Sequence, residues 1–316
     1  MKQAILSFGT ALILSTVFTA LLIPFLKRKH IGQNIREVGP KHQKKAGTPT
    51  MGGMAFVPAI ILAVLPFIGK HPEVVSILVM TVGYGLIGML DDGLKKKHGV
   101  NLGLKAWQKF ALQMILTAAF CWYRMTQMPD PTVIRIPFMK GQADIGWWYV
   151  PLLFLVVLGA DNGVNLTDGI DGLCSSVTAV VALFFTALSF LYGSGIEPVT
   201  AAVCGALLGY LLFNTNPARI FMGDTGSLAL GGFVASTALI LRQPFMLLIC
   251  GIIYVCETLS VMIQVSYFKL SHGKRVFKMT PIHHTFEFYN WSEARIVIVF
   301  TVITAFFCAV GYLAWP

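Results

Sequence analysis

The stretch Asn162–Gly172, NGVNLTDGIDG, lies between two apolar runs at 147–160 and 173–192. It holds amides, glycines and two carboxylates, although a carboxylate in hydrocarbon costs about 2.5–3.5 kcal/mol on membrane-insertion scales. We therefore expect the stretch to lie where a membrane helix meets water. Its glycines let the backbone come close to a ligand. Asp168 and Asp171 either face that ligand or only cap the first turn of the helix that follows.

The composition is that of a polytopic membrane protein. Of the 316 residues, 56% are hydrophobic and 12% are charged, with a mean hydropathy of +0.72, whereas about 25% are charged in an ordinary soluble domain. We predict a single integral-membrane domain over residues 1–316. The net charge of +10 does not indicate a nucleic-acid partner, because Lys and Arg gather in the cytoplasmic loops of membrane proteins. The six cysteines lie in apolar runs without a CxxC pair, so we expect small buried hydrophobes rather than disulfides or zinc ligands.

The apolar runs predict an all-α polytopic protein of about ten transmembrane helices. The runs are 4–26, 53–68, 74–90, 110–123, 147–160, 173–192, 199–213, 228–241, 245–270 and 294–315. Among them, the runs 147–160, 199–213 and 228–241 look short against the usual span of about 17–25 residues, so eight spans is the alternative. Between Arg124 and Gly146, short apolar alternation among prolines predicts a small extracytoplasmic hairpin.

The positions of Lys and Arg predict the orientation of the chain. Lys27–Lys29 follow the first run and should face the cytoplasm. With ten spans and both termini outside, 18 of the 24 Lys and Arg residues fall inside. The 6 outside are Lys2, Lys70, Arg124, Arg135, Lys140 and Arg242. The basic clusters Lys95–Lys97 and Lys274–Lys278 then share the inner side, as the rule requires.

Most aspartates gather on the same inner face in this topology. Six of the eight are placed there, at expected helix ends: Asp91, Asp92, Asp161, Asp168, Asp171 and Asp224. His283 and His284 lie on that side too, in an expected basic loop. Acids beside many lysines on one membrane face indicate a metal together with a phosphorylated ligand. Mg²⁺ suits this setting because it takes one or two carboxylates and keeps phosphate oxygens and waters.

Two acidic segments adjoin expected helix ends. Gly223–Ser227, GDTGS, precedes an apolar run and predicts an anion site built from backbone N–H groups at a helix N-terminus. A plain polar cap is the alternative. Asp91 and Asp92 end another run, where negative charge is disfavoured. A metal or Lys95 would relieve that repulsion; the alternative is a solvated surface pair.

Three further features have both functional and structural interpretations. Pro281–Glu287, PIHHTFE, offers two imidazoles that donate to phosphate when protonated, and no Cys or His partner has the spacing of a zinc site. Lys44–Gly53, KKAGTPTMGG, is either functional or the ordinary positive-inside signal. Glu257 lies inside an apolar run, and intramembrane acids are functional candidates. An interhelical hydrogen bond explains Glu257 equally well.

Taken together, these segments resemble a known family, the polyprenyl-phosphate N-acetylhexosamine-1-phosphate transferases. The matching segments are GTPTMGG (Gly47–Gly53), LDD (Leu90–Asp92), VNLTDGIDGL (Val164–Leu173), NTNPA (Asn214–Ala218), FMGDTGSLALGG (Phe221–Gly232), ETLSV (Glu257–Val261) and PIHH (Pro281–His284). They run over most of the chain in the right order, and the first and last favour the muramoyl branch of the family. The chain departs from the family where Thr285 replaces a third histidine, and where Asp161 and Gly163 replace the frequent Ser and Ala.

The resemblance implies a Mg²⁺-dependent reaction at the cytoplasmic face of a bacterial inner membrane. Phospho-MurNAc-pentapeptide would pass from UDP-MurNAc-pentapeptide to the membrane lipid undecaprenyl phosphate, giving lipid I and UMP. A homodimer is also implied, with no nucleic-acid partner. Breaking a pyrophosphate needs mainly charge stabilisation. An attack by an aspartate and a simple deprotonation of the acceptor are both compatible with the residues.

The resemblance also implies roles for individual residues. Asp224 would be the metal ligand, with Asp91 and Asp92 assisting the metal or the lipid phosphate. The catalytic set would be Asp91, Asp92, Asp168, His283 and His284. The substrate-binding set would be Lys45, Thr50, Asn165, Gly169, Asp171, Asn214 and Phe221, with Phe221 stacking on uracil.

Other functions compete with this interpretation. A sister transferase using UDP-N-acetylglucosamine would share most of these segments. A transporter of nucleotide sugars or divalent cations would place ionisable groups near the bilayer midplane, whereas here all candidates but Glu257 are expected at one face. A non-enzymatic membrane scaffold needs no facing carboxylates.

Overall fold

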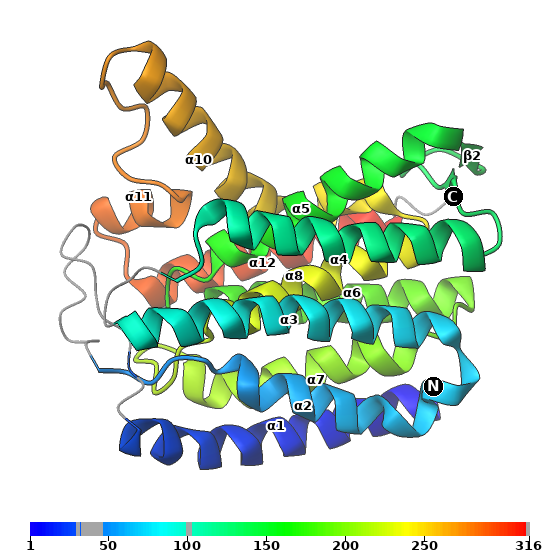
Figure 1. The fold of residues 1–316 in the computed structure, drawn as a ribbon, viewed down its shortest axis with the longest axis horizontal. Helices are drawn as coiled ribbons and strands as arrows, with labels where there is room; N and C mark the ends of the chain where they lie inside the picture. The colour runs from blue at the N-terminus through cyan, green and yellow to red at the C-terminus, as the bar shows by residue number, and fades with distance from the viewer. Residues whose placement is uncertain (30–31, 33–46, 99–102, 314–316) are drawn as a thin grey trace.

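The computed structural model describes residues 1–29, 32, 47–98 and 103–313, and it is a bundle of helices (Figure 1). The helices are α1 (Lys2–Arg28), α2 (Gly53–Val64), α3 (Pro72–His98), α4 (Ala106–Gln127), α5 (Tyr149–Thr167), α6 (Leu173–Tyr192), α7 (Glu197–Asn214), α8 (Gly223–Ile240), α9 (Leu247–Cys250), α10 (Ile252–Leu270), α11 (Ile282–Phe288) and α12 (Glu293–Leu313). Short 3₁₀ turns lie at Leu65–Lys70, Gly146–Trp148 and Pro244–Met246.

The described helices make the chain a multi-pass membrane protein. Six are long and apolar enough to cross a membrane, namely α1, α3, α5, α6, α7 and α12. The bent pair of α9 and α10 adds a seventh if it counts as one span, and α2 belongs to a shorter apolar helix. Helices also stand at the other expected runs, as α4 and α8. Every residue of α8 from Thr225 to Ile240 is buried, and a helix surrounded by protein needs no continuous apolar face for lipid.

Glycines bring α3 and α8 into close contact. A Cβ at Gly88 of α3 would lie 2.0 Å from the carbonyl oxygen of Asp224, at the start of α8. A Cβ at Gly232 of α8 would lie 2.6 Å from the carbonyl oxygen of Met80. Small residues at such positions let two helix backbones approach closely in a membrane protein. The beginning of α8 is therefore held against α3 one turn before Asp91.

Two helices extend past their expected ends. The run expected to stop at Leu90 continues to His98, so Asp91 and Asp92 lie inside α3 rather than at its end. The run expected to stop at residue 160 continues as α5 to Thr167, so Asn162 and Asn165 are helical. Both errors have one cause. Hydropathy stops at the first polar residue, whereas several of these polar side chains find partners on neighbouring helices and the helix goes on.

The alternative that Asp168 and Asp171 only cap the sixth run is wrong. Gly172 occupies the N-cap position of α6 in a left-handed conformation, with φ of 80°, and no side chain caps the helix. Neither Asp168 nor Asp171 serves that purpose. A glycine adopts positive φ without steric cost, which lets the chain turn sharply from α5 into α6. The two carboxylates are left for other contacts.

The long helix expected over 245–270 is broken. A 3₁₀ turn and α9 end at Cys250, Gly251 follows, and α10 departs at an angle of 87°. A continuous apolar run gives no sign of a bend, which explains the error. The base of α10 packs on α5, where a Cβ at Gly163 would lie 3.1 Å from the Tyr254 carbonyl oxygen. Its far end projects from the bundle and exposes Met262, Phe268 and Leu270 (Figure 1).

The two ends of the bundle differ in character. β1 (Val133–Ile134) pairs antiparallel with β2 (Ala143–Asp144), within the segment where alternation pointed to a hairpin. In Figure 1 this hairpin and the N-terminus lie at one end, whereas α11 and the C-terminal end of α3 lie at the other. The acids of α3 are therefore far from the hairpin and near the histidines of α11.

A substitution at Gly88 tests the close contact of α3 and α8. We expect Gly88→Ala to lower the melting temperature in detergent and to reduce activity, because the new Cβ forces the start of α8 away from α3. Overpacking of this kind typically costs about 1–3 kcal/mol. Gly93→Ala is the matched control on the same helix, because a Cβ at Gly93 would have no neighbouring atom within 4 Å. Equal melting temperatures for the two variants would contradict the prediction.

Candidate active site

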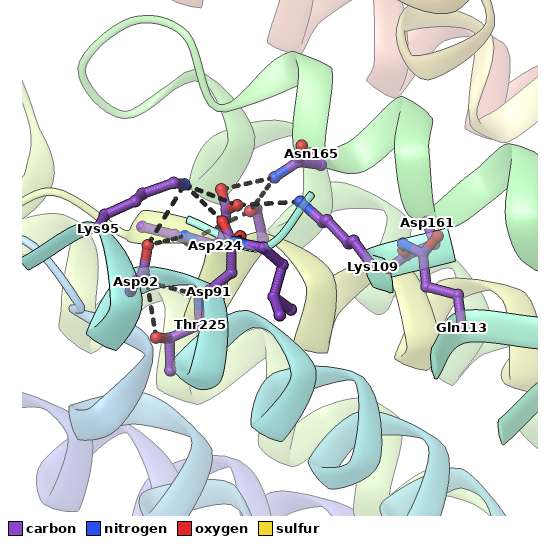
Figure 2. A network of polar contacts seen from close by, with 12 residues as sticks. Asp91, Asp92, Lys95, Lys109, Gln113, Asp161, Asn165, Asp224 and Thr225 are labelled. Carbon is purple, nitrogen blue, oxygen red and sulfur yellow. Dashed lines mark hydrogen bonds and ion pairs between the residues drawn. The ribbon is translucent and has the colours of Figure 1, made fainter. Parts of the chain in front are cut away.

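Three carboxylates meet where α3 touches the start of α8. Asp91 and Asp92 come from α3, and Asp224 comes from the first turn of α8. One oxygen of each lies within 4.8 Å of the others, and Figure 2 shows all three converging. We call these residues the aspartate cluster. Asp91 and Asp92 are buried, and Asp224 is partly exposed.

Two lysines neutralise the aspartate cluster. The Lys95 ammonium, one turn after Asp91, lies 2.7 Å from Asp91 Oδ2 and 3.0 Å from Asp224 Oδ2. Lys109 of α4 lies 2.9 Å from the same Asp224 oxygen. The Lys95 partner that the sequence predicted as one way to relieve the acid pair is confirmed. The contribution of Lys109 was missed, because its sequence position showed only a basic loop.

Asp92 caps α8 from a neighbouring helix. Its Oδ2 accepts hydrogen bonds from the backbone N–H of Thr225 at 2.9 Å and from the Thr225 hydroxyl at 2.7 Å. Its Oδ1 accepts from the backbone N–H of Asp224 at 3.2 Å. A carboxylate is favoured at a helix N-terminus, where N–H groups lack partners in the helix itself. The polar cap expected for GDTGS therefore comes from α3, and not from this segment's own side chains.

Further contacts fix Asp91 and Asp224. Asp91 Oδ1 accepts the backbone N–H of Leu104 at 2.7 Å, which ties down the start of the segment leading to α4. Asn165 of α5 donates its amide to Asp224 Oδ1 at 3.1 Å and to the Ser227 hydroxyl at 2.8 Å. The structure therefore brings Asn165, expected to contact substrate, directly onto the expected metal ligand.

Asp168 follows α5 and lies close enough to the aspartate cluster to interact with it electrostatically. Burial raises the pKa of its carboxyl group well above the usual range, and the nearby carboxylates of Asp224, Asp92 and Asp171 raise that pKa further. Like charges disfavour the ionised form. Asp168 is thus a group whose protonation state responds to the charge of the cluster.

Asp171 and Asn214 shape the backbone between α7 and α8. Asp171 Oδ2 accepts hydrogen bonds from the Asn216 amide at 3.2 Å and the Ala218 N–H at 3.0 Å. Asn214 accepts from the Ser175 hydroxyl at 2.8 Å and donates to the carbonyl of Ile220 at 3.0 Å. Both side chains are buried. They hold in place the segment that ends at residue 221.

The GTPTMGG segment joins the site through its backbone. Phe221 donates its N–H to the Pro49 carbonyl at 2.8 Å and accepts the Gly52 N–H at 2.9 Å, while its ring stays partly exposed. A Cβ at Gly223 would lie 3.0 Å from the Thr50 hydroxyl oxygen. Thr50 and Phe221 therefore flank the start of α8. Lys45 lies outside the described residues.

The sequence predicted a loop for the histidines, but they lie on the short helix α11. His283 is fully buried, and its Nδ1 lies 3.0 Å from Oε1 of Glu257, which is also buried. The interhelical hydrogen bond considered for Glu257 comes from the backbone N–H of His283, which donates to Glu257 Oε2 at 3.5 Å, and not from Nδ1 of the imidazole. Its Nε2 faces Gly169, where a Cβ would lie 2.1 Å away, and has no hydrogen-bond partner among the described residues. Only glycine at 169 leaves room for the ring.

The next two side chains of α11 have local partners. His284 Nδ1 lies 2.6 Å from Glu287 Oε2, and its ring centroid is 4.1 Å from that of His283. The Thr285 hydroxyl donates to the Met279 carbonyl and accepts the Met279 N–H at 3.4 Å. Thr285 therefore ties α11 to the segment before it. That is a structural role at the position where a third histidine was expected.

The donor set of the aspartate cluster fits a hard divalent cation. All its ligand atoms are carboxylate oxygens, the type that Mg²⁺ prefers, and the Lys95 ammonium already lies in contact with two of the three acids. Positive charge is thus favoured at this point. The two lysines and the amide of Asn165 add hydrogen-bond donors beside these oxygens.

Comparison with known proteins places these residues in a family. A profile described as glycosyl transferase family 4 matches residues 74–242, and one described as phospho-N-acetylmuramoyl-pentapeptide-transferase signature 1 matches residues 45–57. A protein named phospho-N-acetylmuramoyl-pentapeptide-transferase from Clostridium botulinum (strain Alaska E43 / Type E3) is 47% identical over 99% of this chain and 96% of its own length.

Two further relatives carry the same name. The Clostridium perfringens (strain SM101 / Type A) protein is 46% identical over 98% of this chain and 96% of its own length. The Shouchella clausii (strain KSM-K16) protein is 46% identical over 97% of this chain and 94% of its own length. With this degree of identity over nearly the full length, the chain belongs to glycosyl transferase family 4 and, within it, to the phospho-N-acetylmuramoyl-pentapeptide transferases.

Proposed function

We propose that this chain transfers phospho-MurNAc-pentapeptide from UDP-MurNAc-pentapeptide to undecaprenyl phosphate, giving lipid I and UMP. The relatives' shared name identifies the sugar phosphate. The observation that carries the proposal is the aspartate cluster bridged by Lys95, because it combines oxygen ligands with fixed positive charge. Phosphoryl transfer needs mainly positioning and charge stabilisation, and such a cluster supplies both.

We assign the cluster a magnesium ion held by Asp224, with Asp91 and Asp92 assisting. When bound, Mg²⁺ would neutralise charge on the pyrophosphate and polarise it. The chain's own residues do the rest. Lys95 and Lys109 supply the positive charge that draws a phosphate toward the acids. Asp92 holds the first turn of α8 and so fixes the position of Asp224.

Two sides of the cluster suit the two substrates. The acids of α3 suit the acceptor, a lipid phosphate, because they can take a proton from it once a cation reduces the repulsion. The partly exposed ring of Phe221 suits the donor nucleotide, on which it can stack. Gly169, the neighbour of Asp168 in the chain, lies against the His283 ring. Asp168, whose pKa is raised by burial and by the nearby carboxylates, is a further group that can exchange a proton.

The membrane arrangement follows from this assignment. We propose ten spans with both termini outside, the aspartate cluster at the cytoplasmic face of the bacterial inner membrane, and a homodimer. The charge distribution, 18 of 24 Lys and Arg inside, supports the orientation. A soluble nucleotide and a membrane lipid can meet only at such an interface, which is where the end of α3 would lie. The hairpin of β1 and β2 would then be extracytoplasmic.

One assay separates the muramoyl substrate from its closest rival. Purified protein with undecaprenyl phosphate and Mg²⁺ should release UMP when given UDP-MurNAc-pentapeptide. It should release little when given UDP-N-acetylglucosamine, because the GTPTMGG and PIHH segments favour the muramoyl branch. Release of UMP from UDP-N-acetylglucosamine alone would show that the chain is the sister transferase.

Replacing Asp224 tests the assigned metal ligand. We expect Asp224→Asn to remove activity while the protein still folds, because it removes the charge to which both lysines bind and reduces affinity for the cation. Steady-state UMP release over a range of Mg²⁺ concentrations measures this, with the melting temperature as the check on folding. Near-normal turnover with unchanged Mg²⁺ dependence would count against the assignment.

The histidine and the threonine of α11 should behave differently. We expect His283→Ala to lower kcat by roughly 10²–10⁴-fold, the usual range for a lost proton-transfer group, and to raise KM for the UDP-sugar. Thr285→Ala should leave the kinetics nearly unchanged and instead cost about 1 kcal/mol of stability for its lost hydrogen bonds to Met279. Kinetics and melting on both variants decide this, and equal losses of kcat would refute the division of roles.

A further inference from the structure

A further carboxylate, outside the aspartate cluster, lies buried on α5, one helical turn before Asn165. Asp161 of α5 is fully buried, and its Oδ2 accepts the Gln113 amide at 2.5 Å. Its Oδ1 has no hydrogen-bond partner among the described residues. A buried carboxylate is costly unless it is paired with positive charge or fully hydrogen-bonded. Asp161 therefore has an unused acceptor in the core of the protein.

The arrangement of α4 and α5 places Lys109 one helical turn from Gln113, the residue that binds Asp161. Lys109 and Gln113 are four residues apart on α4, as are Asp161 and Asn165 on α5, so each pair shares one helix face. Gln113 donates a hydrogen bond to Asp161. One turn away, Lys109 and Asn165 both bind Asp224. The Lys109 ammonium also attracts the Asp161 carboxylate electrostatically. Figure 2 shows the Lys109 side chain between the two acids.

The cation assigned to Asp224 conflicts with the position of Lys109. Lys109 binds Asp224 Oδ2, one of the oxygens that a divalent ion at the cluster would use. This oxygen already contacts two ammonium groups, Lys95 at 3.0 Å and Lys109 at 2.9 Å, so a divalent ion bound there would be repelled by both unless at least one of them moved away. Lys95 can keep Asp91 at 2.7 Å when the ion arrives. Within the described part of the chain Lys109 has no such second contact at the cluster, and its flexible stem of four carbons can turn toward Asp161 instead.

We propose that Asp161 is a positioning residue that receives the Lys109 ammonium when a divalent cation occupies Asp224. The free Oδ1 then gains the positive partner that it lacks, and Asp224 Oδ2 becomes available to the metal. Metal binding is thereby coupled to the exchange of the Lys109–Asp224 ion pair for a Lys109–Asp161 ion pair. This inference rests on the metal site proposed above, and it concerns the chain's own lysine rather than the identity of the transferred group.

A double-mutant cycle on metal affinity tests the coupling without any turnover. Mn²⁺ binding would be measured on purified protein by the electron paramagnetic resonance signal of free Mn²⁺, with competition by Mg²⁺. The proteins are wild type, Asp161→Asn, Lys109→Met and the double variant. Asp224→Asn is the control that the measured ion binds at the cluster, and melting temperatures without metal check folding. Asp161→Ser runs through the same cycle, so the test stands if Asp161→Asn does not fold.

We expect Asp161→Asn to weaken Mn²⁺ binding by roughly 5- to 150-fold, the usual range of coupling between two sites. Lys109→Met should tighten binding, because the competing ammonium is gone. In the Lys109→Met background, Asp161→Asn should then have no effect. An equal loss in both backgrounds would overturn the inference, since Asp161 would be acting only as a nearby negative charge. Unchanged affinity in Asp161→Asn would overturn it too, and no Mn²⁺ binding by the wild type would overturn the metal site itself.

Discussion

The contact on which the site depends is the hydrogen bonding of the Asp92 carboxylate to the first turn of α8. One side chain of α3 accepts the N–H groups of residues 224 and 225 and the Thr225 hydroxyl. These distances are reached only because Gly88 lets the two backbones touch one turn earlier. The same carboxylate satisfies the helix terminus and sets the position of Asp224. One set of hydrogen bonds from Asp92 thus caps α8, joins α3 to α8 and positions Asp224.

The charges of the site are balanced by side chains from three helices. Asp91, Asp92 and Asp224 carry three negative charges, and Lys95 and Lys109 return two positive ones within 3.0 Å of Asp224 Oδ2. A small excess of negative charge favours a cation, while the lysines keep the site receptive to phosphate. Exposed ion pairs contribute little to stability, but these are largely enclosed and hydrogen-bonded to backbone. Their arrangement therefore serves the chemistry more than the fold.

The sequence singled out the acids that the structure brings together, but it placed the ends of the helices that carry them less well. Hydropathy correctly located the apolar runs but ended them at Leu90 and at residue 160, because it cannot tell a polar residue that ends a helix from one that meets a partner. Asp92, which binds Thr225, and Asn165, which binds Ser227, are of the second kind. Such partners come from segments distant in sequence, so only the packed structure reveals them.

The break at Gly251 explains how the histidines reach the site. Because α10 departs at 87°, its base lies against α5 while the rest projects from the bundle. The base carries Glu257, which binds His283 of α11, and this imidazole in turn lies against Gly169 beside Asp168. A straight helix over 245–270 would carry Glu257 along the bundle axis and leave α11 without that partner. The bend, which hydropathy does not reveal, is therefore what joins the PIHH segment to the segment at 162–172.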